Sequence, residues 1–329
     1  MRLRLCEKKM ELITKIPISK SNHPLDYNSR IVSFGSCFVE NMGGKFEYYK
    51  FQNITNPFGI LFQPLAIEKL IAFAISEKEF TTNDVFFHNE RWHCFDAHSA
   101  LSHPQKEVLL KNLNNVLQLT SQNLKQATHC IITLGTAWVY QHKTSGELVA
   151  NCHKVPQKEF EKRLLTVDEI EKSLKNIIGS VRKLNPDCSL IFTISPVRHL
   201  KDGFTENQVS KSHLISALYK TRNAEEFKQD LYYFPSYEIV MDELRDYRFY
   251  APDMIHPNPT AIDYIWNRFS EYCISEEAFL VMKEVGGIQK GMAHKPFNPD
   301  SESHISFLND LQEKIQSLQK RFSHIDFYK

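Results

Sequence analysis

The chain has 329 residues, 42% of them hydrophobic, which is enough to bury a full-sized core. Its 40 Lys and Arg balance its 39 Asp and Glu, so the charge indicates no nucleic-acid or membrane-surface partner. The seven cysteines show no CxxC spacing, which argues against a disulfide scaffold. We find no signal-peptide pattern and no run of roughly 18 apolar residues. We therefore expect a cytoplasmic protein. Residues 1–29 are polar and form an expected N-terminal approach segment, with translation starting at Met1 or Met10.

Apolar runs and amphipathic segments alternate along the rest of the chain. The expected strands are residues 30–34, 51–54, 129–134, 188–194 and a last one at 233–241. The expected helices are residues 37–49, 64–77, 104–127, 167–184, 207–228 and 259–275. This alternation predicts an α/β fold with a mainly parallel sheet that helices cover on both faces.

Residues 30–275 are expected to form this α/β domain, which two hairpins interrupt. One hairpin is expected at 84–95, inside an insertion at about 60–127, and the other at 138–154. Residues 276–329 form an expected C-terminal helical extension. Its stripe of apolar residues favours packing over partner binding, and consists of Leu308, Leu311, Ile315 and Leu318.

Ligands of parallel α/β sheets bind outside the carboxyl ends of the strands, which locates the expected chemistry. The segments that follow the expected strands are Gly35-Ser36-Cys37, Asn56 to Gly59, Gly135-Thr136, Ser195-Pro196 and the loop with Asp253 and His256.

The first of these segments offers two nucleophiles side by side, Ser36 and Cys37, at the start of an expected helix. Backbone N–H groups and the helix dipole at such a position lower a thiol pKa and can bind an oxyanion. Asp253 could orient His256, which would then act as the base that a serine or cysteine nucleophile needs. Alternatively, Cys37 is a small buried apolar residue, and Asp253 caps a turn beside an incidental histidine.

Five stretches of the chain together resemble one known family. They are FGSCFVENMGGKF (34–46), NPFGI (56–60), ITLGTAWVY (132–140), TISPVRH (193–199) and DMIHP (253–257). The first is similar to the motif of the GSCFA family, in the SGNH/GDSL hydrolase superfamily, and the resemblance covers roughly residues 10–290. Membership implies a three-layer α/β/α fold of flavodoxin-like type, with the nucleophile after the first strand and the Asp–His pair after the last.

The resemblance also implies roles for single residues. Cys37 falls at the position of the superfamily's nucleophilic serine, and Ser36 at that of the preceding aspartate. Backbone N–H groups of Cys37, Gly59 and Gly135 are the implied oxyanion donors. Ala137 stands where the superfamily has an asparagine that binds the oxyanion, a loss that costs on the order of 3 kcal/mol in related chemistry.

Further polar and aromatic residues are expected to contact substrate. Asn56 and Thr136 are candidates to compensate for the missing asparagine. The other candidates are Trp138, Trp92, Asp96, His98, His153 and Arg198. The histidines of residues 86–103 recur every five residues and cannot share one face, so we expect no metal site, and nothing indicates a cofactor.

These residues predict an acyl hydrolase or O-acyltransferase with a Cys37 (or Ser36), His256 and Asp253 triad. Its substrate would be an O-acylated carbohydrate or a similar small ester. One alternative is a catalytically degenerate fold that binds a glycan or a protein; another is a cysteine-dependent thioesterase.

Overall fold

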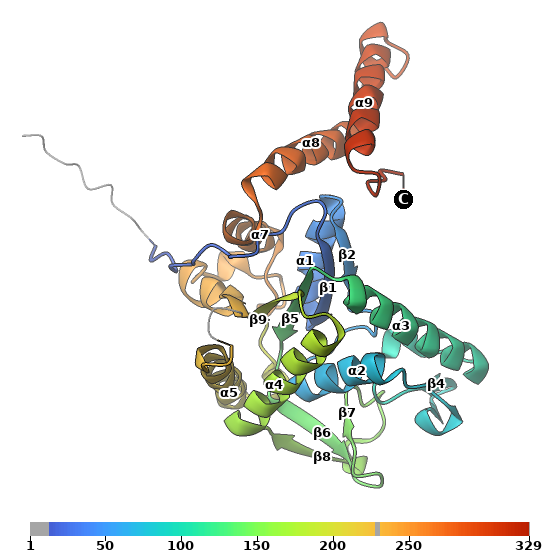
Figure 1. Ribbon diagram of the computed structural model, residues 1–329, viewed down its shortest axis with the longest axis vertical. Coiled ribbons are helices and arrows are strands. Elements are labelled where there is room, and N and C mark those ends of the chain that lie inside the picture. Colours follow the sequence, from blue (N-terminus) through green and yellow to red (C-terminus); the bar gives the residue numbers. More distant parts are fainter. Residues whose placement is uncertain (1–12, 228–230, 329) are drawn as a thin grey trace, which may run out of the picture.

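Five parallel strands form the centre of the computed structural model, which describes residues 13–227 and 231–328 (Figure 1). The expectation about translation from Met1 or Met10 lies outside these residues. The strands are β1 (Arg30–Gly35), β2 (Gln52–Thr55), β5 (His129–Leu134), β9 (Ser189–Ile194) and β10 (Leu231–Phe234). Their order across the sheet is β10-β9-β5-β1-β2, the flavodoxin-like order, which confirms the predicted fold class.

Helices cover both faces of this sheet, because its inner strands are apolar on both sides. Val32, Ile132 and Phe192 face one layer of helices, and Ile31, Ile131 and Ile191 face the other. The first layer contains α2 (Pro64–Ser76), α3 (Lys106–Gln126), α4 (Val167–Leu184) and α5 (Phe204–Asn223). The second contains α1 (Cys37–Tyr48) and α7 (Pro259–Cys273).

The first predicted hairpin is confirmed as β3 (Phe86–His88) and β4 (Arg91–His93). Asn89 and Glu90 both have positive φ, as the tight turn of a two-residue hairpin requires. The second, β6 (Trp138–His142) with β7 (Leu148–Val149), is also present. It gains an unpredicted third strand, β8 (Phe160–Leu164), whose sequence FEKRL has the charged composition of an exposed edge.

The predicted last strand at 233–241 was wrong in its extent. The strand β10 ends at Phe234, because Pro235 has no N–H to donate to the ladder. The following residues turn into helix α6 (Ser236–Glu238) and a π-helical turn over Ile239–Glu243. The buried Ile239 and Val240 therefore belong to a helical turn and not to a strand.

The C-terminal extension consists of α8 (Glu276–Met292) and α9 (Glu302–Arg321), which lead away from α7 (Figure 1). Leu311, Ile315 and Leu318 are buried in the same apolar cluster as α1 and α7, whereas Leu308 is exposed. The stripe therefore packs, as predicted, along three of its four residues. None of the helices in residues 13–227 and 231–328 is long and apolar enough to cross a bilayer.

Candidate active site

The turn between β1 and α1 is built around Gly35. Its φ is +144°, and a Cβ atom there would lie 2.2 Å from the carbonyl oxygen of Thr133 on β5. The Gly35 N–H donates to Asn56 Oδ1 at 2.8 Å, and Asn56 Nδ2 donates to Glu40 on α1 at 2.6 Å. Asn56, one of the predicted substrate contacts, thus braces the turn that carries the candidate nucleophiles.

Ser36 and Cys37 differ in their surroundings. Ser36 is fully buried and is the N-cap of α1, where its hydroxyl accepts the Phe38 N–H at 3.4 Å. Cys37 is half-buried at the first position of the helix. The thiol, not the hydroxyl, is therefore the more accessible of the two.

The environment of Cys37 raises the pKa of its thiol above the ordinary value, mainly through burial. The positive charge of Lys211 and the backbone N–H groups of Cys37 and Phe38 lower this pKa, and Glu40 raises it. The helix N-terminus thus acts in the predicted direction, but burial outweighs it.

Asp253 and His256 form a close pair in the loop before α7. Asp253 Oδ2 lies 2.6 Å from His256 Nδ1, and Asp253 Oδ1 accepts the N–H groups of Ile255 and His256 at 2.9 and 3.0 Å. These hydrogen bonds lower the pKa of Asp253 to about 2. The carboxylate therefore stays ionised and fixes the Nδ1–H tautomer, which leaves Nε2 as the basic nitrogen of His256.

His199 interacts electrostatically with both His256 and Lys211. Burial lowers the pKa of His199 to about 4, and the charges of Lys211 and His256 both contribute in the same direction. Its ring packs edge-on against Phe62 at 5.1 Å. Within the described residues, no hydrogen bond joins His256 to Cys37 or Ser36.

Lys211 is the principal residue of this cluster that the sequence analysis missed. It is fully buried on α5, and its Nζ donates to the carbonyl oxygens of Gly135 and Ser195 at 2.6 and 2.7 Å. A sequence signal was present, because Lys211 precedes Leu214 and Leu218 by three and seven residues and so lies on the apolar stripe of its helix.

The candidate oxyanion donors are not equally available. The Gly59 N–H donates to Asn56 O at 2.7 Å, and the Gly135 N–H donates to Phe62 O at 2.8 Å. In the part of the chain that the structure describes, the Cys37 N–H donates to no backbone oxygen. Of the three, Cys37 is the one whose N–H is open in this conformation.

Residues that follow β5 are held by α5. Thr136 Oγ1 lies 3.0 Å from Ser210 Oγ, which also accepts the N–H of the buried Ala137 at 2.7 Å. Trp138 donates from its indole to Glu206 O at 3.2 Å and stacks under Lys162. Thr136 therefore supports the loop, while Trp138 forms part of its surface.

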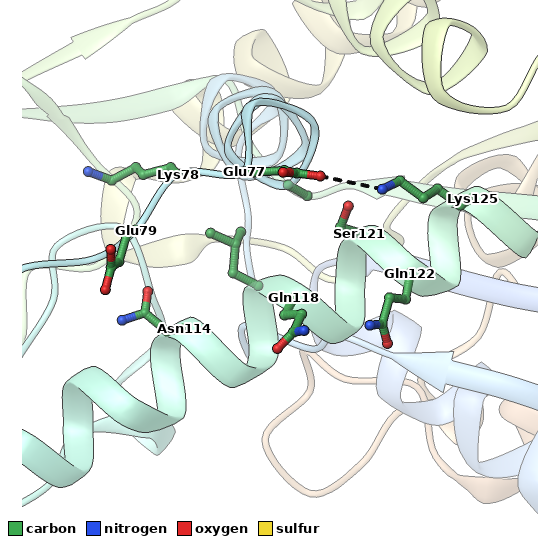
Figure 2. Close-up of a pocket in the computed structure, with 10 residues that line it drawn as sticks. Glu77, Lys78, Glu79, Asn114, Gln118, Ser121, Gln122 and Lys125 are labelled. Atoms are coloured by element: carbon green, nitrogen blue, oxygen red, sulfur yellow. Dashed lines mark ion pairs between the residues drawn. The ribbon is translucent and has the colours of Figure 1, made fainter.

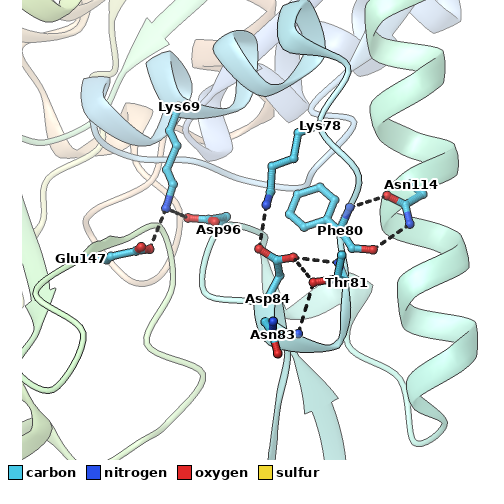
Figure 3. A network of polar contacts seen from close by, with 9 residues as sticks. All are labelled: Lys69, Lys78, Phe80, Thr81, Asn83, Asp84, Asp96, Asn114 and Glu147. Carbon is cyan, nitrogen blue, oxygen red and sulfur yellow. Dashed lines mark hydrogen bonds and ion pairs between the residues drawn. The ribbon is translucent and has the colours of Figure 1, made fainter.

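Four predicted substrate contacts lie in or beside the segment between α2 and α3. Asp96 pairs with Lys69 of α2 at 2.7 Å, and Lys69 also reaches Glu147 (Figure 3). His153 is buried, and its Nε2 bonds to Cys94 O. Trp92 packs under Lys106. These three residues contact the hairpin segment and its neighbours.

His98 is the member of this segment that approaches the nucleophile turn. A Cβ atom on Gly59 would lie 2.4 Å from His98 Cβ, so Gly59 is needed for this close approach. Burial lowers the pKa of His98, and Glu40 opposes this shift. His98 thus neighbours the Asn56–Glu40 brace.

Arg198 lines a pocket of about 450 Å³ beside the Asp253–His256 loop. Aromatic residues Tyr237, Tyr247 and Tyr250 share this lining. A second pocket, of about 410 Å³, lies between the end of α2 and α3, where Glu77 pairs with Lys125 (Figure 2). Lys125 lies in the last turn of α3, shortly before β5 begins at His129, so this pocket lies toward the amino ends of the strands. Its lining includes neither histidine nor cysteine.

No curated protein matches this chain. A solved structure from Streptococcus pneumonia, provisionally described as a platelet activating factor, is similar with a TM-score of 0.38 and 13% identity, over 74% of this chain and 84% of that one. A mutant acetyl esterase with an acetate ion is similar with a TM-score of 0.26 and 12% identity, over 50% and 66%. The C-terminal domain of GSCFA domain proteins matches residues 285–329, and the GSCFA family matches residues 30–269, so the chain belongs to the GSCFA family.

Proposed function

We propose that the chain is a cysteine-dependent acyl hydrolase or O-acyltransferase that acts on an O-acylated carbohydrate or a similar small ester. The observation that carries this proposal is the Asp253–His256 pair, joined by 2.6 Å. Its imidazole acts electrostatically on His199, and Lys211 acts on both His199 and Cys37. A half-buried thiol at a helix start and a carboxylate-oriented imidazole are the parts that covalent acyl transfer needs.

The reaction would proceed in two steps. His256 takes the proton of the Cys37 thiol, the resulting thiolate attacks the acyl carbonyl, and His256 gives this proton to the leaving alcohol, so that a thioester forms and the ester bond breaks. His256 then removes the proton of water or of an acceptor hydroxyl, which attacks the thioester and releases Cys37. The open Cys37 N–H would stabilise the oxyanion in both steps.

The pocket beside the loop supports a carbohydrate as the alcohol part of the substrate. Tyr237, Tyr247 and Tyr250 offer ring faces with hydroxyl groups, and Arg198 and Asp242 add charged donors and acceptors. This mixture suits a ligand that has both apolar faces and hydroxyl groups.

The test is ester turnover by the intact protein and two variants. The assay panel contains p-nitrophenyl acetate, acetylated monosaccharides and an acyl thioester, the last for the thioesterase alternative. Cys37→Ala should abolish turnover, whereas Ser36→Ala should retain it and lose about 1 kcal/mol of stability with the helix cap. Full activity in Cys37→Ala would overturn the proposal.

A glycan- or protein-binding role without turnover is the second candidate. It is favoured by the engaged N–H groups of Gly59 and Gly135, which leave one open oxyanion donor among the three. Binding of acetylated sugars to the intact protein, with no turnover of any ester or thioester, would support this role.

A further inference from the structure

The pocket of about 450 Å³ that Arg198 lines is joined to the loop of the Asp–His pair by backbone contacts. The Ala251 N–H donates to His256 O at 2.7 Å. Tyr250, which lines the pocket, forms an antiparallel bridge with Pro257, the residue that follows His256. A ligand in the pocket would therefore lie beside the segment that carries His256.

Charged side chains of both signs line this pocket, but they differ in exposure. Asp242 and Asp246 are exposed, and each has an arginine partner. A guanidinium nitrogen of Arg245 lies 3.7 Å from Asp242, and one of Arg248 lies 2.8 Å from Asp246. Arg198 is half-buried and has no carboxylate partner among the residues that the structure describes. Of the described charged residues in the lining, Arg198 is thus the one without a counter-charge.

The Arg198 guanidinium also has hydrogen-bond donors available. Its Nη2 donates to Met241 Sδ at 3.4 Å, and a thioether sulfur is a weak acceptor. Its side chain forms no other hydrogen bond within residues 13–227 and 231–328, and the Tyr250 hydroxyl forms none there either. Met241 lies in the π-helical turn over Ile239–Glu243, a rare element that is frequent at functional sites.

We propose that this pocket binds an anionic group on the alcohol part of the substrate, an inference that rests on the proposed function. Because His256 gives a proton to the leaving alcohol, the part of the substrate beside His256 is the alcohol. The substrate is then the ester of an acidic sugar, which carries a carboxylate or a phosphate. Arg198 pairs with this anion through two parallel N–H groups, and the Tyr250 hydroxyl donates to it as well.

An anion would balance the charge of Arg198, which a neutral sugar would leave unpaired. A half-buried charge is screened by water less than an exposed one, so a counter-charge stabilises it more. Hydrogen bonds between two charged groups are about twice as strong as those between neutral groups. The pocket should therefore discriminate acidic sugars from neutral sugars of the same size.

The first experiment measures binding, because binding needs no turnover. Isothermal titration calorimetry at low salt compares glucuronic acid, glucose 6-phosphate and glucose as ligands of the intact protein. At least one acidic sugar should bind about tenfold or more tightly than glucose, and the tighter of the two identifies the anion as a carboxylate or a phosphate. Arg198→Gln should remove this preference. Arg198→Lys keeps the charge without the planar fork and should retain part of it.

Arg321→Gln is the matched control, because it removes the same charge from α9, where Arg321 pairs with Glu284. This variant should bind the acidic sugars as the intact protein does. The proposal would be overturned if neither acidic sugar binds, if glucose binds as tightly as both, or if Arg198→Gln keeps the preference.

Steady-state kinetics with the acetyl esters of these sugars separates this inference from the proposed function. Arg198→Gln should raise KM for the acidic esters about tenfold or more with little change in kcat, because the anion is held equally in the bound and transition states. Its KM for acetylated glucose should stay within about twofold. A preference for acidic sugars that depends on Arg198, in a protein that cleaves none of the esters, would retain the anion site and reject the proposed function. Turnover with equal KM values for acidic and neutral esters would do the reverse.

Discussion

Asp253 Oδ2 lies 2.6 Å from His256 Nδ1, and the other oxygen of this carboxylate holds two backbone N–H groups of the same turn. The turn and the imidazole are thus fixed by one side chain. The side chains of Asp253 and His256 are both half-exposed. Their ion pair therefore orients the imidazole more than it stabilises the fold.

Asp253→Asn should reduce turnover by about a thousandfold or more while the protein remains folded. An amide can accept the backbone N–H groups, but it cannot stabilise the imidazolium or fix the required tautomer. Steady-state kinetics with p-nitrophenyl acetate measures the effect. Asp263→Asn is the matched control, because Asp263 is an exposed carboxylate on α7 that pairs with Lys45. Equal rates in both variants would remove Asp253 from the mechanism.

Gly35→Ala should destabilise the protein by more than about 4 kcal/mol, as expected when a buried backbone must move. The new Cβ atom would meet Thr133 O at 2.2 Å, and φ at this residue is +144°. Gly44→Ala, on α1 where a Cβ atom meets no atom within 4 Å, should instead stabilise the helix by about 1 kcal/mol. Urea unfolding of the two variants checks both values, and a tolerated alanine at residue 35 would contradict the close approach of β1 to β5.

Lys69→Met should destabilise the segment that carries Asp96 by about 1–3 kcal/mol at neutral pH. The pKa of Asp96 is already raised by burial, which the charge of Lys69 opposes. Without Lys69 this pKa rises further, so the folded state binds the proton more readily than the unfolded state. Lowering the pH then favours the folded state of Lys69→Met. The free energy of unfolding that this variant loses relative to the intact protein should therefore shrink as the pH falls through the pKa of Asp96.

Urea unfolding at several pH values measures this dependence. Glu147→Gln is the control, since Glu147 is the exposed partner of Lys69 and should change stability by less than about 0.5 kcal/mol. If the stability that Lys69→Met loses does not vary with pH, the charge of Lys69 does not stabilise the ionised form of Asp96.

The sequence predicted the sheet, its covering helices and the Asp–His loop, since apolar runs and short-range spacing determine these features. The approach of His98 to Gly59 could not be predicted, because it depends on how the hairpin segment packs. Lys211 was missed because a lysine in a helix is ordinarily exposed, although its place on the apolar stripe of α5 was visible. The strand β8 was missed because tertiary pairing overrode its charged composition.

The central claim, that Cys37 is the acylated residue, is tested most directly by trapping the intermediate. His256→Ala is incubated with p-nitrophenyl acetate, whose leaving group needs no protonation, so that the enzyme is acylated but cannot activate water. Mass spectrometry should find one acetyl group on Cys37 that neutral hydroxylamine removes, as a thioester requires. An acetyl group on Ser36, or no acetylated residue in a protein that still turns over the ester, would contradict the account.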